Sequence, residues 1–117
     1  MTVITEHSSK IKVELPKKDV HARMPVFYNP DMKLNRDITL LLLNAIKNQN
    51  MRVADPLAAS GIRSIRMLME LHKSKIKKVF MNDASSVATK NINKNLQINK
   101  INKSKITIAN REANKFL

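Results

Sequence analysis

The sequence contains no cysteine and no tryptophan, one glycine, and only three Phe and one Tyr. Without cysteine it has no disulfides or thiolate metal sites. The three histidines, His7, His21 and His72, are scattered without the spacing of metal ligands, so we assign no metal site. A core must therefore rest on Ile, Leu, Val, Met and Ala, and a hydrophobic content of 43% is sufficient for a folded domain.

Long hydrophobic runs are also absent. No apolar stretch approaches the roughly 20 residues that a bilayer-spanning helix requires. The segment Met1–Lys10 includes Glu6 and His7 and has no long apolar run, so it does not resemble a signal peptide. We expect a cytoplasmic protein without a membrane partner.

Acidic side chains are scarce as well: nine Asp and Glu stand against 22 Lys and Arg, a formal net charge of +13. This excess favours a polyanionic partner, because binding to phosphates releases condensed counterions. A lysine-rich solvated surface would give the same count. A small basic RNA-binding module without a cofactor therefore stays open as an interpretation. The length, 117 residues, suits one domain or part of one.

The alternation of apolar and polar residues predicts a β-hairpin followed by helices and strands in turn. The hairpin joins Val3–Thr5 to Ile11–Glu14 through a polar turn at His7–Ser9, and a basic loop completes a first unit, residues 1–24. The expected helices are Arg36–Lys47, Ile62–His72 and a third from Ser85 or Ser86 to about Gln97. The expected strands are Met51–Asp55, Lys75–Met81 and Lys105–Ala109. This order implies a parallel sheet with right-handed crossovers.

The first helix is indicated by apolar residues that recur with a period of about 3.6 residues. These residues are Ile38, Leu41, Leu42, Ala45 and Ile46. Asn35 or Asp31 is expected to cap the helix.

A set of polar or small residues follows each predicted strand: Asp55–Gly61, Asn82–Asp83 and Asn110–Glu112. Ligands of an open parallel sheet bind outside the carboxyl ends of its strands. The recurrence of these sets at three strand ends is therefore the main functional clue in the sequence, and we expect them to converge on one crevice.

The loop Asp55–Gly61 would let a ligand approach the backbone and offer N–H groups at the start of the next helix. An ordinary tight turn with Asp55 as a cap is the alternative. Asp83 follows Gly61 by about 20 residues, a placement that suits an acid binding both ribose hydroxyls, although it could also be a helix N-cap. The loop lacks Gly-Lys-Ser/Thr and further glycines, so a nucleoside ligand without pyrophosphate fits better than NAD.

Four strings, Val26–Pro30, Asn35–Asp37, Asp55–Arg66 and Asn82–Asp83, are similar in order and spacing to the archaeal and eukaryotic tRNA guanine-N2 dimethyltransferases, which modify guanosine 26. The resemblance covers nearly the whole chain. It implies an α/β, Rossmann-like class I S-adenosylmethionine-dependent methyltransferase fold. Here that fold is incomplete, with its first three parallel strands in residues 25–117 behind the N-terminal hairpin.

The resemblance also implies residue roles. Arg36 and Arg63 would contact the methionine end of S-adenosylmethionine, because a guanidinium suits a carboxylate. Asp83 would hold the ribose, and the pair Glu112–Ala113 falls where the family has Asp-Ala beside the adenine. The cofactor loop contributes Asp55, Ala58 and Gly61.

Several of these residues have simpler readings. Without the resemblance, Arg36 reads as a solvated charge at a helix start and Arg63 as a surface or phosphate contact. Tyr28 either stacks on a base or anchors its own segment in a local core.

In the resembled family the guanine is held by an Asp-Pro-Phe-Gly motif after the fourth strand. That motif is absent here, where the only Asp-Pro is Asp55-Pro56, so we assign no catalytic residue. We expect the N-terminal, cofactor-binding part of such an enzyme, inactive alone, with tRNA as a partner and a second polypeptide as the source of the remaining fold. Another α/β nucleotide-binding enzyme is a further alternative.

Overall fold

An antiparallel hairpin and a three-stranded parallel sheet contain the strands of this computed structural model, which describes residues 2–13 and 28–117. In the hairpin, β1 (Thr2–Glu6) pairs with β2 (Ser9–Val13). The parallel sheet has the order β3 (Met51–Asp55), β4 (Ile76–Asn82), β5 (Ile106–Ala109). The predicted hairpin and parallel sheet are thus confirmed. The predicted basic loop and residues 26–27 of the string Val26–Pro30 lie outside the described residues.

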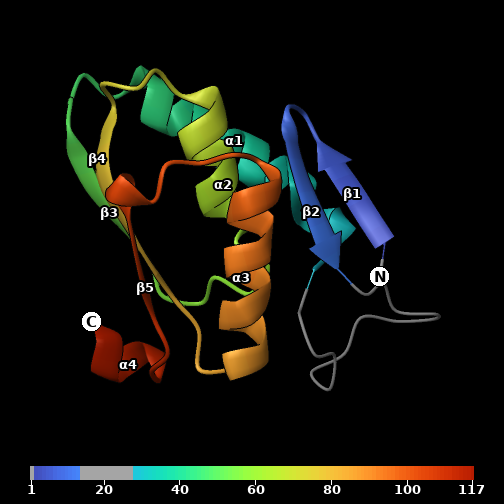
Figure 1. Cartoon of the computed structure of the whole chain (residues 1–117). Helices are drawn as coiled ribbons and strands as arrows, with labels where there is room; N and C mark the ends of the chain where they lie inside the picture. The colour runs from blue at the N-terminus through green and yellow to red at the C-terminus, as the bar shows by residue number, and fades with distance from the viewer. Residues whose placement is uncertain (1, 14–27) are drawn as a thin grey trace.

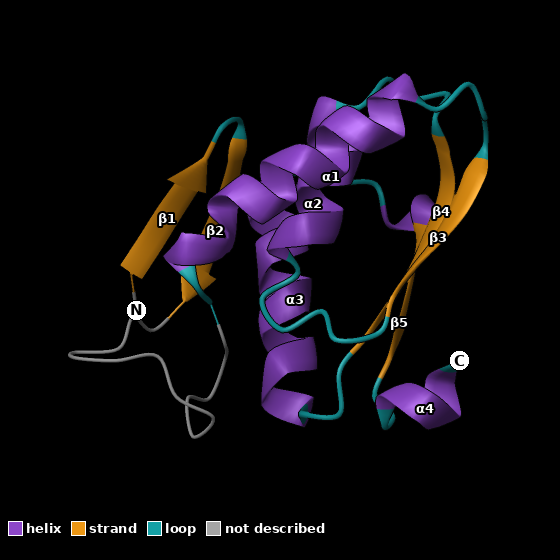
Figure 2. Ribbon diagram, turned by 180° about the vertical axis from the view of Figure 1, so that it is seen from behind, coloured by secondary structure: helices purple, strands orange, loops and turns teal. Residues whose placement is uncertain are grey.

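The longer helices lie between the parallel sheet and the hairpin, as Figures 1 and 2 show from opposite sides. They are α1 (Lys33–Ala45), α2 (Ile62–Glu70) and α3 (Ser86–Ile98). The shorter ones are η1 (Pro30–Met32), η2 (Lys103–Lys105) and α4 (Ala113–Phe116). Within the ranges that the structure describes, no helix is long and apolar enough to cross a membrane.

The helix starts show which cap predictions were right. Ser85 caps α3, since its hydroxyl accepts a hydrogen bond from the Ala88 N–H at 3.3 Å. For α1 the prediction was wrong: Asn35 lies within the helix and Asp31 within η1. The chain enters α1 through η1, whose start is capped by Asn29, so α1 begins three residues before the predicted Arg36.

The apolar stripe that predicts α1 faces outward. Leu34, Ile38, Leu41 and Leu42 are each more than half exposed, whereas Arg36 and Leu40 are the buried residues of the helix. The rotation of α1 is set by charged groups, because Arg36 pairs with a carboxylate of the hairpin and Asp37 pairs with an arginine of α2. Periodicity therefore located this helix without identifying its buried face.

The core lies between the sheet and α2 and α3. Its fully buried side chains include Ile65 of α2, Val79 and Met81 of β4, and Ile92 and Leu96 of α3. The hairpin extends this core on the other side of the helices through two further buried residues, Ile11 and Val13.

Two asparagines of α3 and the asparagine at its C-cap bind the edge of β2 that does not pair with β1. Asn99 accepts a hydrogen bond from the Lys10 N–H at 2.8 Å and donates to the Lys10 carbonyl at 2.6 Å. Asn95 accepts from the Lys12 N–H at 2.8 Å, and Asn91 donates to the Lys12 carbonyl at 2.9 Å. The three side chains, one helical turn apart, satisfy a strand edge as a neighbouring strand would. The recurrence of asparagine at positions 91, 95 and 99 therefore has a structural role.

Candidate functional site

The three strand-end sets are hydrogen-bonded together at one end of the parallel sheet, but only the first of them lines the pocket described below, so their convergence on one ligand crevice stays a prediction. The Ala59 N–H donates to Asp83 Oδ2 at 2.9 Å, which joins the loop after β3 to the end of β4. The Asp83 N–H donates to the Ala109 carbonyl at 3.3 Å, and the Asn110 side chain donates to the Asp83 carbonyl at 2.8 Å. Loops that follow all three strands are thus hydrogen-bonded into one surface.

The loop after β3 is held in shape by its own amides. The N–H groups of Ala58 and Gly61 donate to the carbonyls of Asn82 (2.9 Å) and Ala58 (2.8 Å), and that of Ala59 is bound to Asp83. These three amides are therefore already bound within the protein, and ligand binding by N–H groups at the start of α2 stays a prediction. Gly61 adopts φ +84°, and Ala59 takes a left-handed conformation at φ +50°.

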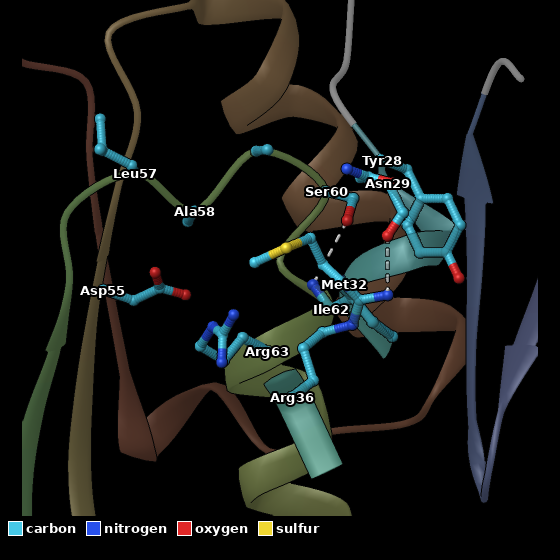
Figure 3. A pocket seen from close by; sticks show the side chains of 11 residues that line it. Tyr28, Asn29, Met32, Arg36, Asp55, Leu57, Ala58, Ser60, Ile62 and Arg63 are labelled. Carbon is cyan, nitrogen blue, oxygen red and sulfur yellow. Dashed lines mark hydrogen bonds between the residues drawn. The ribbon is translucent and has the colours of Figure 1, made fainter. Parts of the chain in front are cut away.

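A pocket of about 150 Å³ lies between this loop and the segment that leads into α1 (Figure 3). Four predicted site residues line it: Arg36, Asp55, Ala58 and Arg63. Ligand pockets commonly measure about 300–1,000 Å³, so this one suits a single end of a nucleoside-sized ligand. Among residues 2–13 and 28–117, no cluster of three His, Asp or Glu side chains could hold a metal ion.

Asp55 and Arg63 point toward one another across the pocket in Figure 3. Burial raises the pKa of the Asp55 carboxyl, while a hydrogen bond from the Ser64 hydroxyl (2.6 Å) and the charge of Arg63 oppose the shift. Because Asp55 binds that hydroxyl and not a backbone N–H, it is not an ordinary helix cap. The Arg63 guanidinium donates to Thr39 and Asn35, both at 2.7 Å. These hydrogen-bond partners are neutral, so of the groups named here only the Asp55 carboxyl interacts electrostatically with its positive charge.

Arg36 is buried, so it is not a solvated charge. Its guanidinium donates from Nε to Glu6 Oε1 at 2.9 Å, pairs through Nη2 with Glu6 Oε2, and donates to the Asn29 carbonyl at 3.1 Å. It also lies over the Tyr28 ring at 5.1 Å. Contact of Arg36 with a ligand carboxylate stays a prediction, and the structure adds a protein carboxylate that the prediction did not include.

Glu6 is the partner that sequence reasoning missed. Only 2% of this residue is exposed, and it also accepts from the Tyr28 hydroxyl at 2.5 Å and from Arg66 at 3.3 Å. Burial alone would raise the pKa of Glu6, but hydrogen bonds from Arg36 and Tyr28 and the charges of Arg36 and Arg66 outweigh it and lower the pKa. Burial and the nearby Glu6 raise the pKa of Tyr28 to about 12. Tyr28 is therefore an anchor of its own segment.

Each carboxylate oxygen of Asp83 accepts a hydrogen bond from a different backbone N–H. Oδ2 accepts from the Ala59 N–H, and Oδ1 accepts from the Ser85 N–H at 2.9 Å. The helix-cap interpretation of Asp83 is wrong, because Ser85 occupies that position. Each carboxylate oxygen has a second lone pair, which keeps the acid able to accept hydrogen bonds from a ribose.

Glu112 and Ala113 follow β5 and start α4, but they do not line the pocket. The Glu112 side chain is 68% exposed, and its ion pair with Lys115 measures 4.0 Å. Their place beside an adenine stays a prediction. The preceding residue, Arg111, is held by the buried side chain of Asn82, a residue that sequence reasoning placed at the strand end without giving it a role.

The described arrangement matches solved methyltransferases. A S-adenosylmethionine-dependent methyltransferase from Agrobacterium tumefaciens superposes with a TM-score of 0.74 at 14% identity, over 98% of this chain and 33% of that protein. Trm1 from Pyrococcus horikoshii, solved with S-adenosyl-L-methionine, superposes with a TM-score of 0.80 at 32% identity, over 99% of this chain and 32% of that one. The strand order and these superpositions show that this chain has the fold of the S-adenosylmethionine-dependent methyltransferases.

The family follows from the sequence comparisons. The family model for the N2,N2-dimethylguanosine tRNA methyltransferases matches residues 7–117, and the chain belongs to this family. The tRNA (guanine(26)-N(2)/guanine(27)-N(2))-dimethyltransferase of Aquifex aeolicus is 42% identical over 100% of this chain and 30% of that protein. The tRNA (guanine(26)-N(2))-dimethyltransferase of Sulfurisphaera tokodaii is 44% identical over 80% of this chain and 23% of that protein. The chain thus spans under a third of these relatives.

Proposed function

We propose that this chain forms the S-adenosyl-L-methionine-binding part of a tRNA (guanine(26)-N2)-dimethyltransferase, which transfers methyl groups to the exocyclic amine of a tRNA guanosine. The observation that carries the proposal is the junction of loop and acid at the strand ends, where the Ala59 N–H meets the Asp83 carboxylate. It supports the proposal because a carboxylate that can accept hydrogen bonds from ribose hydroxyls is bound directly to the Asp55–Gly61 loop.

Charge supports the assignment of the two ends of the cofactor. The methionine end carries a carboxylate and an ammonium group, and the pocket holds the guanidinium of Arg63 and the carboxylate of Asp55. The ribose then falls to Asp83, and the adenine extends toward Glu112 and Ala113. The net charge of +13 supports tRNA as the partner of the whole enzyme.

The reacting carboxylate is assigned to a part of the fold outside this chain, because the Asp-Pro-Phe-Gly motif of the resembled family is absent from the sequence. β3 is at the edge of the parallel sheet, where a further strand from a second polypeptide would pair. Methyl transfer to tRNA by the purified 117-residue chain alone would contradict this assignment.

The binding proposal is tested by titrating S-adenosyl-L-methionine into the chain in a calorimeter. We expect binding heat for the wild type and a loss of affinity of about tenfold or more for Asp83→Ala, because charge-assisted hydrogen bonds to the ribose are removed. Asp31→Ala deletes the same charge from an exposed site and should leave the affinity unchanged. Absence of heat with the folded wild-type chain would overturn the proposal.

The basic charge favours one alternative, a small RNA-binding module without a cofactor. The two functions separate when tRNA binding, followed by fluorescence anisotropy, is measured together with S-adenosyl-L-methionine binding by calorimetry. In the methyltransferase, Asp83→Ala changes cofactor affinity and leaves tRNA affinity nearly constant. In the RNA-binding module, the same substitution leaves tRNA binding neutral or slightly tighter, and the wild type shows no heat with S-adenosyl-L-methionine.

A further inference from the structure

Asn82 is the last residue of β4, the middle strand of the sheet, and its side chain is completely buried. Its amide nitrogen donates to the Pro56 carbonyl at 3.0 Å and to the Arg111 carbonyl at 2.8 Å. Its amide oxygen accepts from the Arg111 N–H at 3.0 Å. One side chain thus binds the loop after β3 and the loop after β5 at the same time.

The side-chain chemistry at this position is demanding. Two carbonyl oxygens from different loops require two donors, and the Arg111 N–H requires an acceptor, a set that a primary amide supplies in one planar group. An apolar side chain would leave these polar groups without partners. A carboxylate would face both carbonyls with negative charge, and either change costs free energy at a buried site.

Asn82 does not line the pocket, so its influence passes through the loops that it binds. Pro56 opens the loop that carries Ala58 and Ala59, and the Asn82 carbonyl also accepts the Ala58 N–H. Arg111 directly precedes Glu112. Asn82 is therefore a shared anchor of two loops. The loop after β3 lies on the pocket side, and the loop after β5 lies on the side to which the proposed function assigns the adenine.

We propose that Asn82 is a positioning residue for cofactor binding: its buried amide sets the distance between the loop after β3 and the loop after β5. The inference rests on the proposed function for the identity of the ligand. It also predicts that loss of the amide loosens both loops together, including the Ala59 N–H, which Asn82 does not itself bind.

The test compares Asn82→Ala and Asn82→Asp with Asn93→Asp. The control removes one donated hydrogen bond, to the Thr89 carbonyl, from an asparagine of α3 that does not line the pocket, and it makes the same change of charge. We expect S-adenosyl-L-methionine affinity at pH 7.5 to fall about tenfold or more for both Asn82 variants and less than about twofold for the control, because a binding site loses precision when its supporting contacts go.

The pH dependence separates positioning from loss of packing. Once protonated, the carboxyl introduced by Asn82→Asp regains a donor, so its affinity relative to wild type should recover in part between pH 7.5 and 5.5. Asn82→Ala should show no such recovery. Affinities of both Asn82 variants within about twofold of wild type would overturn the proposal, and so would failure of both to fold, since Asn82 would then serve folding and not positioning.

Amide hydrogen exchange of the ligand-free chain gives an answer that does not depend on the cofactor. In Asn82→Asp we expect faster exchange at both Arg111 and Ala59, with little change in the control. Faster exchange at Arg111 alone would show a lost local bond and overturn the coupling of the loops. If the wild type binds no S-adenosyl-L-methionine, the proposed function fails, while the exchange data still decide the role of Asn82.

Discussion

Gly61 must meet two conditions at once. Its φ of +84° is a conformation that side chains rarely adopt, and an added Cβ would approach Met81 Cε to 2.9 Å. Ile65 and Ile92 would lie at 3.5 Å from the same atom. The turn between β3 and α2 therefore needs a residue without a side chain, and the only glycine of the sequence lies at this position.

We expect Gly61→Ala to lower the free energy of unfolding by about 2–3 kcal/mol, from backbone strain together with overpacking against Met81. Ala59→Gly is the matched comparison, since Ala59 is left-handed at φ +50° and glycine relieves strain there. It should change stability by less than about 1 kcal/mol in either direction. Urea denaturation followed by circular dichroism measures both, and equal effects would contradict the account.

At the scale of elements, the hairpin is joined to α3 by amide side chains. Asn95 binds the Lys12 N–H of β2 on one side and donates to the Ser60 carbonyl on the other at 2.9 Å. The edge of the hairpin and the loop after β3 thus share one buried residue. A strand edge satisfied by side chains is also protected from pairing with another molecule.

Asn95→Ala should destabilise the chain by about 2–3 kcal/mol, because it leaves a backbone donor and a backbone acceptor unpaired in a buried place. Asn93→Ala, two residues away, loses a local bond to the Thr89 carbonyl and a long, exposed bond from Lys103 at 3.4 Å, and it should cost less than about 0.5 kcal/mol. Denaturation curves give the two values, and hydrogen exchange at Lys12 reports on the edge itself. Similar losses for both variants would argue against an edge-holding role.

At the scale of the whole molecule, buried charge connects the hairpin to α1 and α2. Glu6 of β1 is bound by Arg36 of α1 and Arg66 of α2, and Arg66 also pairs with Asp37 and Glu70. These contacts put the N-terminal hairpin and one wall of the pocket in a single network, since Arg36 lines the pocket.

The network predicts a pH dependence of stability. Because the pKa of Glu6 is lowered by folding, its stabilising contribution is complete above the ordinary value of 4.5 and is lost as the pH falls through the folded pKa. Glu6→Gln should cost about 3–5 kcal/mol near pH 7, since two buried guanidinium groups lose their carboxylate. The difference between wild type and variant should shrink as the pH falls below 4.5.

Urea denaturation between pH 3 and 7 at about one-unit steps measures this difference. Glu112→Gln, at an exposed position, provides the control and should follow the wild type at every pH. A difference between wild type and Glu6→Gln that stays constant across the series would show that the ionised state of Glu6 does not stabilise the fold.

The residues that the sequence located correctly are those governed by short-range physics. Met51–Asp55 is a strand with the predicted bounds, and Ser85 caps α3 as one of two predicted candidates. The approach of Asp83 to the loop after β3 followed from a topological rule, because the carboxyl ends of parallel strands share one edge of the sheet. Periodicity, caps and crossover rules need only neighbours in the chain, so they can be read without coordinates.

The sequence by itself determined the alternation of strands and helices, the position of the small-residue loop and the family. Only the tertiary structure decided that α1 turns its leucines outward, that Arg36 is paired with Glu6, and that the Asn82 side chain joins two loops. Glu6 lies 30 residues from Arg36 in the chain, and the two loops that Asn82 joins lie 26 and 29 residues from it. Local sequence patterns do not predict such distant partners, because the hydrogen-bond partner of a buried polar group depends on which segments lie beside it in the folded chain.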